Sequence, residues 1–467
     1  MNGNRKSKDA IRVESEGKLK PVPIHASVCL CKNNFDYFNW QNVRHLRSRD
    51  CDSEIRTETL SGCEDRITTV EFLGVTSYTN IKTLLNRCPN LKSLTLTNVL
   101  LSHYDTDYKK FYIIETNDLR NLKFSGSNKL TKDEMHILDF FFRRVRFAAL
   151  KSVNFEYNGQ KRPDDKKKSK QTLRNNFTKA SVNGTSVINF LTQNRLTLKS
   201  LQVTRFGVPL HNNKYDNLNE PVPEHMKLQL SVFECDTGNL GFEKILNNQN
   251  HLEILTCSSK KATSACSVDA IANAIRRCGD TLKEIRILQT ISPNTEFNKE
   301  DIIQHDCAMY KFCNKLEYLH LHVSIPEQLF HAESTTSDAR PGAILNLRFL
   351  PLSISHLILQ FDFISKHGVE LFISRIPKMI NLKFLVFRGN FSSPFKVKSS
   401  WIILLLNHPN IDIFEFSNCK IEDMENIKDV VNSRPELASC LTVTSDGCLF
   451  WREIIPEEAV KQRQSVL

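Results

Sequence analysis

Glycine is scarce in this chain, which has 15 glycines among 467 residues. This scarcity disfavours a glycine-rich nucleotide cradle, and the sequence contains neither a phosphate-loop motif nor a Gly-x-Ser-x-Gly nucleophile motif. Long apolar runs are missing as well, since the longest block, 401–406, is far too short to cross a bilayer. We therefore expect a protein that is not an enzyme, holds no cofactor and has no membrane partner.

A secretory signal is also missing, because no apolar stretch follows the basic residues near the amino terminus. The 14 cysteines are therefore expected to be reduced thiols in a cytoplasmic or nuclear protein. Cys29, Cys31, Cys51 and Cys63 lack the tight Cys-x-x-Cys spacing of a zinc knuckle, so no metal is expected. A net charge of +11 more often serves solubility than binding, and nucleic acid is not an expected partner.

The most informative pattern is a recurring apolar triplet. Leu91, Leu94 and Leu96 form the pattern Leu-x-x-Leu-x-Leu directly after a helix-like run at 81–87. One triplet cannot form a core alone, so a series predicts turns that bury their triplets against one another. The other eleven copies are Ile67, Val70, Phe72; Leu119, Leu122, Phe124; Leu150, Val153, Phe155; Leu198, Leu201, Val203; Leu230, Phe233, Cys235; Leu252, Leu255, Cys257; Leu282, Ile285, Ile287; Leu316, Leu319, Leu321; Ile354, Leu357, Leu359; Leu382, Leu385, Phe387; and Ile411, Phe414, Phe416.

This series predicts an α/β leucine-rich-repeat solenoid, with a curved parallel sheet on the concave side and helices on the convex side. Stretches between the triplets, such as 268–275, place apolar residues three and four apart, which is typical of helices. Ala438, Leu441 and Val443 would form a frayed final copy. The predicted organisation is a disordered or loose basic arm (1–34), an aromatic-rich amino-terminal cap (35–66), the solenoid (67–445) with inserted loops near 159–176 and 325–341, and a carboxy-terminal tail (446–467).

Trp40 is followed by the short strand pattern Val43-x-x-Leu46 and then by the repeat array. This order resembles the junction after the F-box in F-box/leucine-rich-repeat proteins. In that family the F-box binds a Skp-type adaptor and a cullin, and the repeats present a substrate to a ubiquitin ligase of the SCF type. The F-box itself is not found, since residues 1–34 are too short and too polar, so adaptor and cullin are expected only if an F-box lies upstream.

The resemblance thus implies a non-catalytic substrate-recognition subunit, and the alternative is a leucine-rich-repeat scaffold without a ligase role. Residues that alternate with the triplets face the concave side of such a sheet. In early repeats they are small and polar, as at Ser93, Thr95 and Gln202. In later repeats they are aromatic and basic, which is typical of interface anchors. The predicted protein-binding residues are Arg286, Tyr318, His320, His322, His356, Phe384 and Arg388.

Histidines in this set also predict that binding changes between about pH 6 and 7, near the ordinary histidine pKa of about 6.5.

Overall fold

The protein is described by a computed structural model, which covers residues 25–27, 43–50, 55, 60, 62–101, 113–126, 132–157, 184–204, 227–236, 245–259, 266–290, 307–324, 350–361, 366–389, 395–434, 437, 439–444 and 446–451. The predicted loops near 159–176 and 325–341 lie outside these residues, as do the arm (1–34) except for 25–27 and the tail beyond 451.

The described chain is a mixed α/β protein. Its strands are β1 (His25–Ser27), β2 (His45–Arg49), β3 (Thr69–Thr76), β4 (Ser93–Leu101), β5 (Ile114–Thr116), β6 (Asn121–Gly126), β7 (Val145–Phe147), β8 (Ser152–Tyr157), β9 (Ser200–Thr204), β10 (Val232–Asp236), β11 (Ile254–Ser259), β12 (Glu284–Thr290), β13 (Tyr318–Ser324), β14 (His356–Phe361), β15 (Phe384–Arg388), β16 (Phe395–Lys398), β17 (Ile413–Ser417), β18 (Cys419–Glu422), β19 (Leu441–Thr444) and β20 (Gly447–Trp451). Its α-helices are α1 (Tyr78–Arg87), α2 (Lys132–Arg144), α3 (Gly184–Gln193), α5 (Cys266–Cys278), α8 (Lys366–Arg375), α9 (Ser399–Leu406) and α10 (Met424–Ser433), and its 3-10 helices are η3 (Glu64–Arg66), η8 (Cys307–Phe312) and η11 (Ile376–Lys378).

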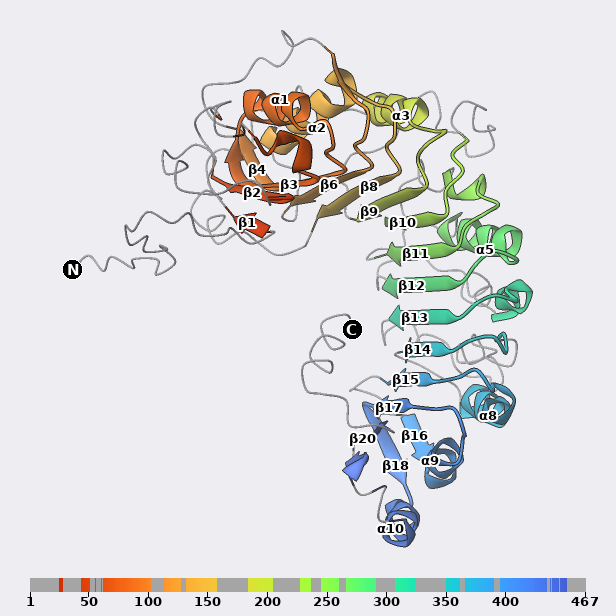
Figure 1. Cartoon of the computed structure of the whole chain (residues 1–467). Coiled ribbons are helices and arrows are strands. Elements are labelled where there is room, and N and C mark those ends of the chain that lie inside the picture. Colours follow the sequence, from red (N-terminus) through yellow and green to blue (C-terminus); the bar gives the residue numbers. More distant parts are fainter. Residues whose placement is uncertain are drawn as a thin grey trace, which may run out of the picture.

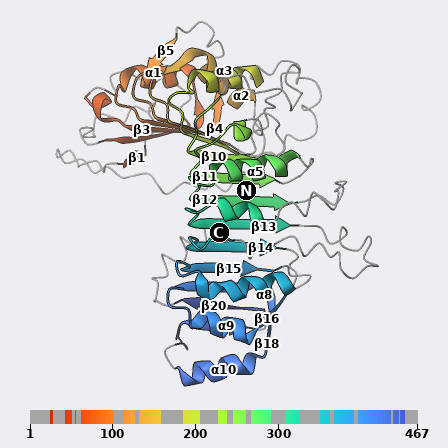
Figure 2. The ribbon, with the colours of Figure 1, turned by 90° about the vertical axis from the view of Figure 1, so that its right-hand side faces the viewer.

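One open sheet of 16 strands runs through the described chain, in the order β1-β2-β3-β4-β6-β8-β9-β10-β11-β12-β13-β14-β15-β17-β20-β19. Neighbouring strands pair in parallel from β1 to β17. Figure 1 shows that the sheet bends and that the helices lie on the outside of the bend. In Figure 2 the helices α5, α8 and α9 stand in front of the strands. We call the face of the sheet away from the helices the inner face.

The apolar triplets explain why these strands form and pair. Every residue of the twelve predicted copies is buried, with a relative exposure of 4% or less. Each triplet stacks on the next without an offset, as when Leu94 pairs with Leu122 and Leu96 with Phe124. A slip by one residue would turn every apolar side chain toward the inner face, so burial fixes the register.

A backbone ladder also couples each turn to the next at the start of its strand. The carbonyl of Lys92 accepts hydrogen bonds from the amides of Arg120 and Asn121, both at 2.9 Å. The carbonyl of Arg120 accepts in the same way from Lys151 and Ser152, at 2.8 and 2.9 Å. The same double acceptance recurs at the carbonyls of Lys151, Lys199, Ser231, Glu253, Lys283, Glu317, Ser355 and Lys383. Equivalent residues of successive turns therefore form straight rows across the sheet.

Helix α1 illustrates how the connecting segments form. Ser77 has extended backbone angles, and its hydroxyl accepts a hydrogen bond from the Asn80 amide at 3.0 Å, which caps the helix. Ile81, Leu84 and Leu85 lie three and four residues apart and are buried against the strands. The apolar residues of α1 and those of the triplets thus belong to one hydrophobic core, which lies between the helix and the sheet.

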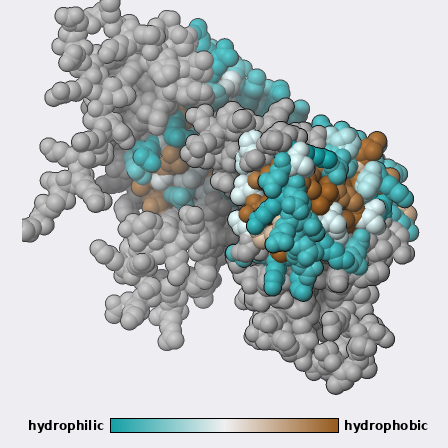
Figure 3. All heavy atoms as spheres, turned by 90° about the horizontal axis from the view of Figure 1, so that it is seen from below, coloured by the Kyte–Doolittle hydropathy of each residue, from teal (hydrophilic) through white to brown (hydrophobic). Residues whose placement is uncertain are grey.

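The carboxy-terminal end of the sheet differs from the expected final repeat. β20 pairs with β17 in antiparallel fashion, and β19 pairs with β20 in the same way, with Leu441 opposite Phe450. The prediction of a frayed parallel copy at Leu441 and Val443 is therefore wrong. The chain reverses between Thr444 and Gly447, which are paired with each other, so that β20 covers the free edge of β17, an edge that would otherwise expose unpaired backbone groups. Seen from below, hydrophobic and hydrophilic residues lie side by side at this end of the molecule (Figure 3).

At the amino-terminal end, β2 pairs in parallel with β3. Val43 and Leu46, the apolar residues of the pattern noted before the array, are both buried. This part of the segment 35–66 thus adds a turn to the sheet in the same way as the repeats do.

Cysteines serve the core as packing residues. Nine cysteines of the described chain, Cys63, Cys88, Cys235, Cys257, Cys278, Cys313, Cys419, Cys440 and Cys448, are free thiols, and all of these but Cys440 are buried. Cys235 and Cys257 occupy paired positions in β10 and β11, each as the last member of its triplet. Burial, aided by nearby negative groups, raises the pKa of the Cys88 thiol to about 12, which keeps it protonated at neutral pH.

Because the triplets are buried, a carboxyl group placed at a triplet position should lower the free energy of unfolding. Leu94→Asp and Leu319→Asp should each destabilise the fold by about 3–5 kcal/mol, since each removes a buried side chain and inserts a polar one. Thermal unfolding followed by circular dichroism measures this loss. The control is Thr95→Asp, at a half-exposed position of the same strand as Leu94. If Leu94→Asp and Thr95→Asp melt at the same temperature, the assignment of the buried face is wrong.

Candidate protein-binding face

The seven predicted binding residues lie on the inner face of four neighbouring strands, β12 to β15. Strand pairing arranges them in rows that cross the sheet, with strands about 4.8 Å apart. One row contains Tyr318, His356 and Phe384, which we call the aromatic row. The second row pairs Arg286 with His320, and the third row runs from His322 through Gln360 to Arg388. The structure therefore brings the predicted residues together.

The three rings of the aromatic row are stacked on one another. The ring centroids of Tyr318 and His356 are 6.1 Å apart with an interplanar angle of 26°. Those of His356 and Phe384 are 5.8 Å apart with an angle of 29°. The Arg286 guanidinium carbon lies 4.8 Å from the Tyr318 ring centroid, within reach of a cation–π contact. His356 is exposed and the two outer rings are half-buried, so the row presents a continuous aromatic surface.

Both arginines of the face are held by glutamates. Arg286 Nε donates to Glu284 Oε1 at 2.5 Å, and Arg388 Nε donates to Glu415 Oε1 at 3.3 Å. Because each positive charge has its own carboxylate, the patch offers oriented guanidinium groups without a large excess charge. Sequence reasoning named neither glutamate as a site residue. Their positions in the sequence could have identified them, since Glu284 and Glu415 also alternate with the buried triplet residues of their strands.

An apolar floor lies between the aromatic row and the third row. Ile358 and Val386 occupy inner-face positions, continue the second row from His320, and pair with each other. Their strand positions predict exposed side chains, but they are 3% and 0% exposed. Neither belongs to the main hydrophobic core cluster. The centre of the face is therefore apolar, with aromatic residues on one side and polar residues on the other.

His320 behaves differently from a surface histidine. Burial, reinforced by the positive charges of His322, Arg286 and Arg388, lowers the pKa of His320 to about 4. This side chain is therefore neutral throughout the range from about pH 6 to 7. The expected change of binding in that range cannot come from His320.

The inner face of the early turns has a different chemistry. Asn154 Nδ2 donates to Gln202 Oε1 at 2.7 Å, and Lys123 forms an ion pair with Glu156 at 2.5 Å. These pairs link neighbouring strands, so polar side chains on this face bind one another across the sheet. The early face therefore lacks the aromatic surface that the later turns present.

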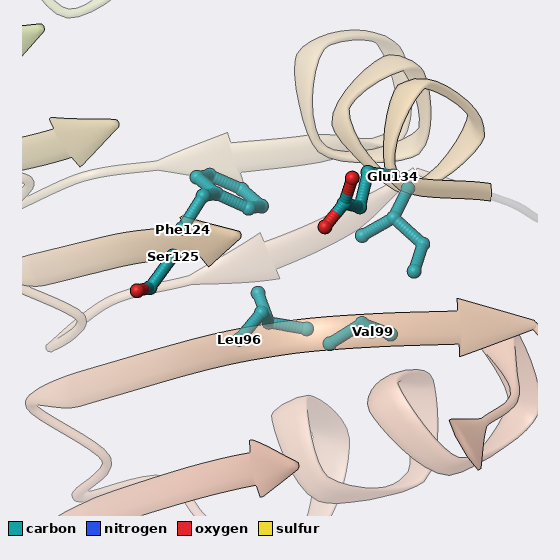
Figure 4. Close-up of a pocket in the computed structure, with 6 residues that line it drawn as sticks. Leu96, Val99, Phe124, Ser125 and Glu134 are labelled. Atoms are coloured by element: carbon teal, nitrogen blue, oxygen red, sulfur yellow. The ribbon is translucent and has the colours of Figure 1, made fainter. Parts of the chain in front are cut away.

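A small hollow lies between α2 and the strands β4 and β6 (Figure 4). It is lined by Leu96, Val99, Phe124, Ser125, Glu134 and Ile137. Its space accommodates about one water molecule, which is too little for a substrate or cofactor. Glu134 lies in it with 6% exposure. The hollow is a packing gap beside a buried carboxyl group.

The lowered pKa of His320 predicts a pH dependence of stability. The unfolded state, with a histidine pKa of about 6.5, binds more protons than the folded state between that value and about pH 4. The stability contributed by neutral His320 is thus complete above about pH 6.5 and is lost as the pH falls through about 4. His320→Gln should therefore reduce the drop in the urea unfolding midpoint between about pH 7 and 4.5. An equal drop in both proteins would show that His320 titrates normally.

Among the residues that the structure describes, no helix is long and apolar enough to cross a membrane. Within the same residues, no group of three or more histidine, cysteine, aspartate or glutamate side chains is arranged to hold a metal ion. No family model matches the chain, and no curated protein sequence matches it.

Proposed function

We propose that this chain is a leucine-rich-repeat solenoid that binds a protein on the inner face of its later turns and catalyses no reaction itself. The solenoid assignment is supported by repeated strand–helix units and by triplets that stack in register from β3 to β17. The observation that carries the binding proposal is the aromatic row, three stacked and partly exposed rings flanked by Arg286.

Exposed aromatic surface of this kind favours a protein partner. Aromatic residues and arginine are enriched among the few residues that supply most of the binding energy at protein interfaces. Aromatic side chains also offer a large contact area at a low cost in side-chain entropy. Here stacking holds the rings in place, and ion pairs orient Arg286 and Arg388 before a partner arrives. Ile358 and Val386 add buried apolar side chains next to the aromatic row on the same face. Preorganisation of this type lowers the entropic cost of association.

Removing two rings of the aromatic row should abolish binding. Each buried aromatic anchor typically contributes about 2 kcal/mol or more, so Tyr318→Ala with Phe384→Ala should weaken binding by a factor on the order of 1,000. Affinity purification from cell extract, with quantitative mass spectrometry, compares the proteins retained by this variant and by the unaltered chain.

The matched control is Thr95→Ala with Gln202→Ala, which alters inner-face positions of the early turns. This control should retain the same proteins as the unaltered chain. Both variants should unfold at similar temperatures, since these positions lie outside the buried triplets. If the control loses the partner while the aromatic variant keeps it, the binding face lies at the other end of the sheet.

A role as substrate-recognition subunit of a cullin-type ubiquitin ligase is the more specific form of this proposal. The resemblance to F-box/leucine-rich-repeat proteins supports it, and so does the buried pair Val43 and Leu46, which joins the sheet directly ahead of the array. The alternative is a scaffold without a ligase role.

A pull-down with a purified Skp-type adaptor separates these roles. It is performed on this chain and on the product of a longer transcript. The ligase role predicts that the adaptor is retained by the longer product, through an F-box ahead of the repeats. Failure of both products to retain it leaves the scaffold role.

A further inference from the structure

We propose that a row of exposed cations at the start of four early strands binds an extended acidic segment of a protein. The row consists of Lys92, Arg120, Lys151 and Lys199, and we call it the basic rim. Its turns precede those of the aromatic row, and the proposal does not rest on the function proposed for that row.

The basic rim is fixed by the backbone ladder. Each of its residues follows the first apolar residue of a triplet, and each carbonyl accepts two amides of the next turn. Lys92 is linked in this way to Arg120, Arg120 to Lys151, and Lys151 to Lys199. With strands about 4.8 Å apart, the four residues span roughly 14 Å in a nearly straight line. The strands that follow them, β4, β6, β8 and β9, lie side by side in Figure 1.

The side chains of the basic rim are available to a ligand. All four residues are exposed. Within the described part of the chain, Lys92, Arg120 and Lys151 make no side-chain hydrogen bond or ion pair, and Lys199 Nζ reaches only the Gln229 carbonyl, at 3.5 Å. Four unpaired cations this close together repel one another, so an anionic ligand that neutralises them is favoured.

A row of small polar residues runs beside the basic rim on the inner face. Its members immediately follow the cations in the sequence and carry hydroxyl or amide groups that are at least partly exposed: Ser93, Asn121, Ser152 and Ser200. Strand pairing places Ser93 beside Asn121, Asn121 beside Ser152, and Ser152 beside Ser200. Hydroxyl and amide groups donate hydrogen bonds to carboxylates, so both rows suit the same anion.

The same strand position loses this character in later turns. There it is occupied by Ser231, Glu253, Lys283, Glu317, Ser355, Lys383 and Asp412, a mixture of both signs. Lys283 is already paired with Glu253 at 2.7 Å. The run of like charges is therefore a property of the early turns and does not follow from the repeat itself.

The chemistry of the neighbourhood favours an acidic polypeptide over nucleic acid. Proteins that hold single-stranded nucleic acid combine cations with aromatic side chains on which the bases stack. The row beside the basic rim consists of serines and an asparagine, which offer no such platform. In an extended peptide, every second side chain points the same way, and these side chains are about 6.6 Å apart. Flexible lysine and arginine side chains on adjacent strands can reach carboxylates at this spacing.

Fluorescence anisotropy of the full-length chain tests the proposal with two probes at low salt. One is a labelled peptide of about ten glutamates, whose extended length of roughly 33 Å exceeds that of the rim. The other is a single-stranded oligothymidylate of the same charge. The peptide should bind more tightly than the oligonucleotide, and its affinity should fall as salt rises, because exposed charges are screened.

Neutralising the centre of the rim locates the site. Arg120→Gln with Lys151→Gln should weaken peptide binding between about twofold and thirtyfold, the range for two exposed ion pairs. The matched control, Lys283→Gln with Lys383→Gln, changes the same strand position in later turns and should leave the affinity unchanged. The proposal is overturned if the peptide does not bind, if both variants lose affinity equally, or if the oligonucleotide binds as tightly as the peptide.

Discussion

The structure depends on the stacking of one apolar triplet on the next without an offset. A single strand with three inward residues cannot exclude water, so each turn is stable only through its neighbours. Because side chains alternate between the two faces of a strand, burial allows a single register. The carbonyl that follows the first residue of each triplet accepts two amides of the next turn and holds that register at the strand start. The open sheet, its helix-covered outer side and its inner face all follow from this one condition.

The same condition determines where function can reside. Triplet positions are buried in every turn, whereas most of the alternating positions are not and can differ from turn to turn. Since the turns are in register, a change repeated over several turns becomes a row of side chains across the sheet. The aromatic row and the basic rim both arise in this way, at different ends of the repeat series. The binding proposed for the first rests on ring surfaces and paired arginines, and that proposed for the second rests on unpaired charge.

Sequence reasoning located the repeated units well, because the buried triplet leaves a periodic signal at every strand. It also placed all seven predicted binding residues on the inner face. It did not foresee that Ile358 and Val386 are buried there, nor that Arg388 is paired with Glu415, which lies in the next turn. Such contacts depend on how the side chains of neighbouring turns meet, and the low pKa of His320 depends on burial and on charges from three strands. Leu441 and Val443 match the repeat pattern, so the sequence does not reveal that β19 pairs with β20 in antiparallel fashion.

Cross-linking between β13 and β14 tests the register most directly, because the two strands are separated by the long segment between residues 324 and 356. His322 and Gln360 are paired residues on the inner face, and adjacent strands about 4.8 Å apart satisfy the Cα separation that a disulfide requires. The variant His322→Cys with Gln360→Cys should form a bridge on mild oxidation, detectable by mass spectrometry. In the variant His322→Cys with His356→Cys, one partner is displaced by four residues, about 13 Å along the strand, so this variant should not form a bridge. A bridge in the second variant and none in the first would contradict the alignment on which the aromatic row depends.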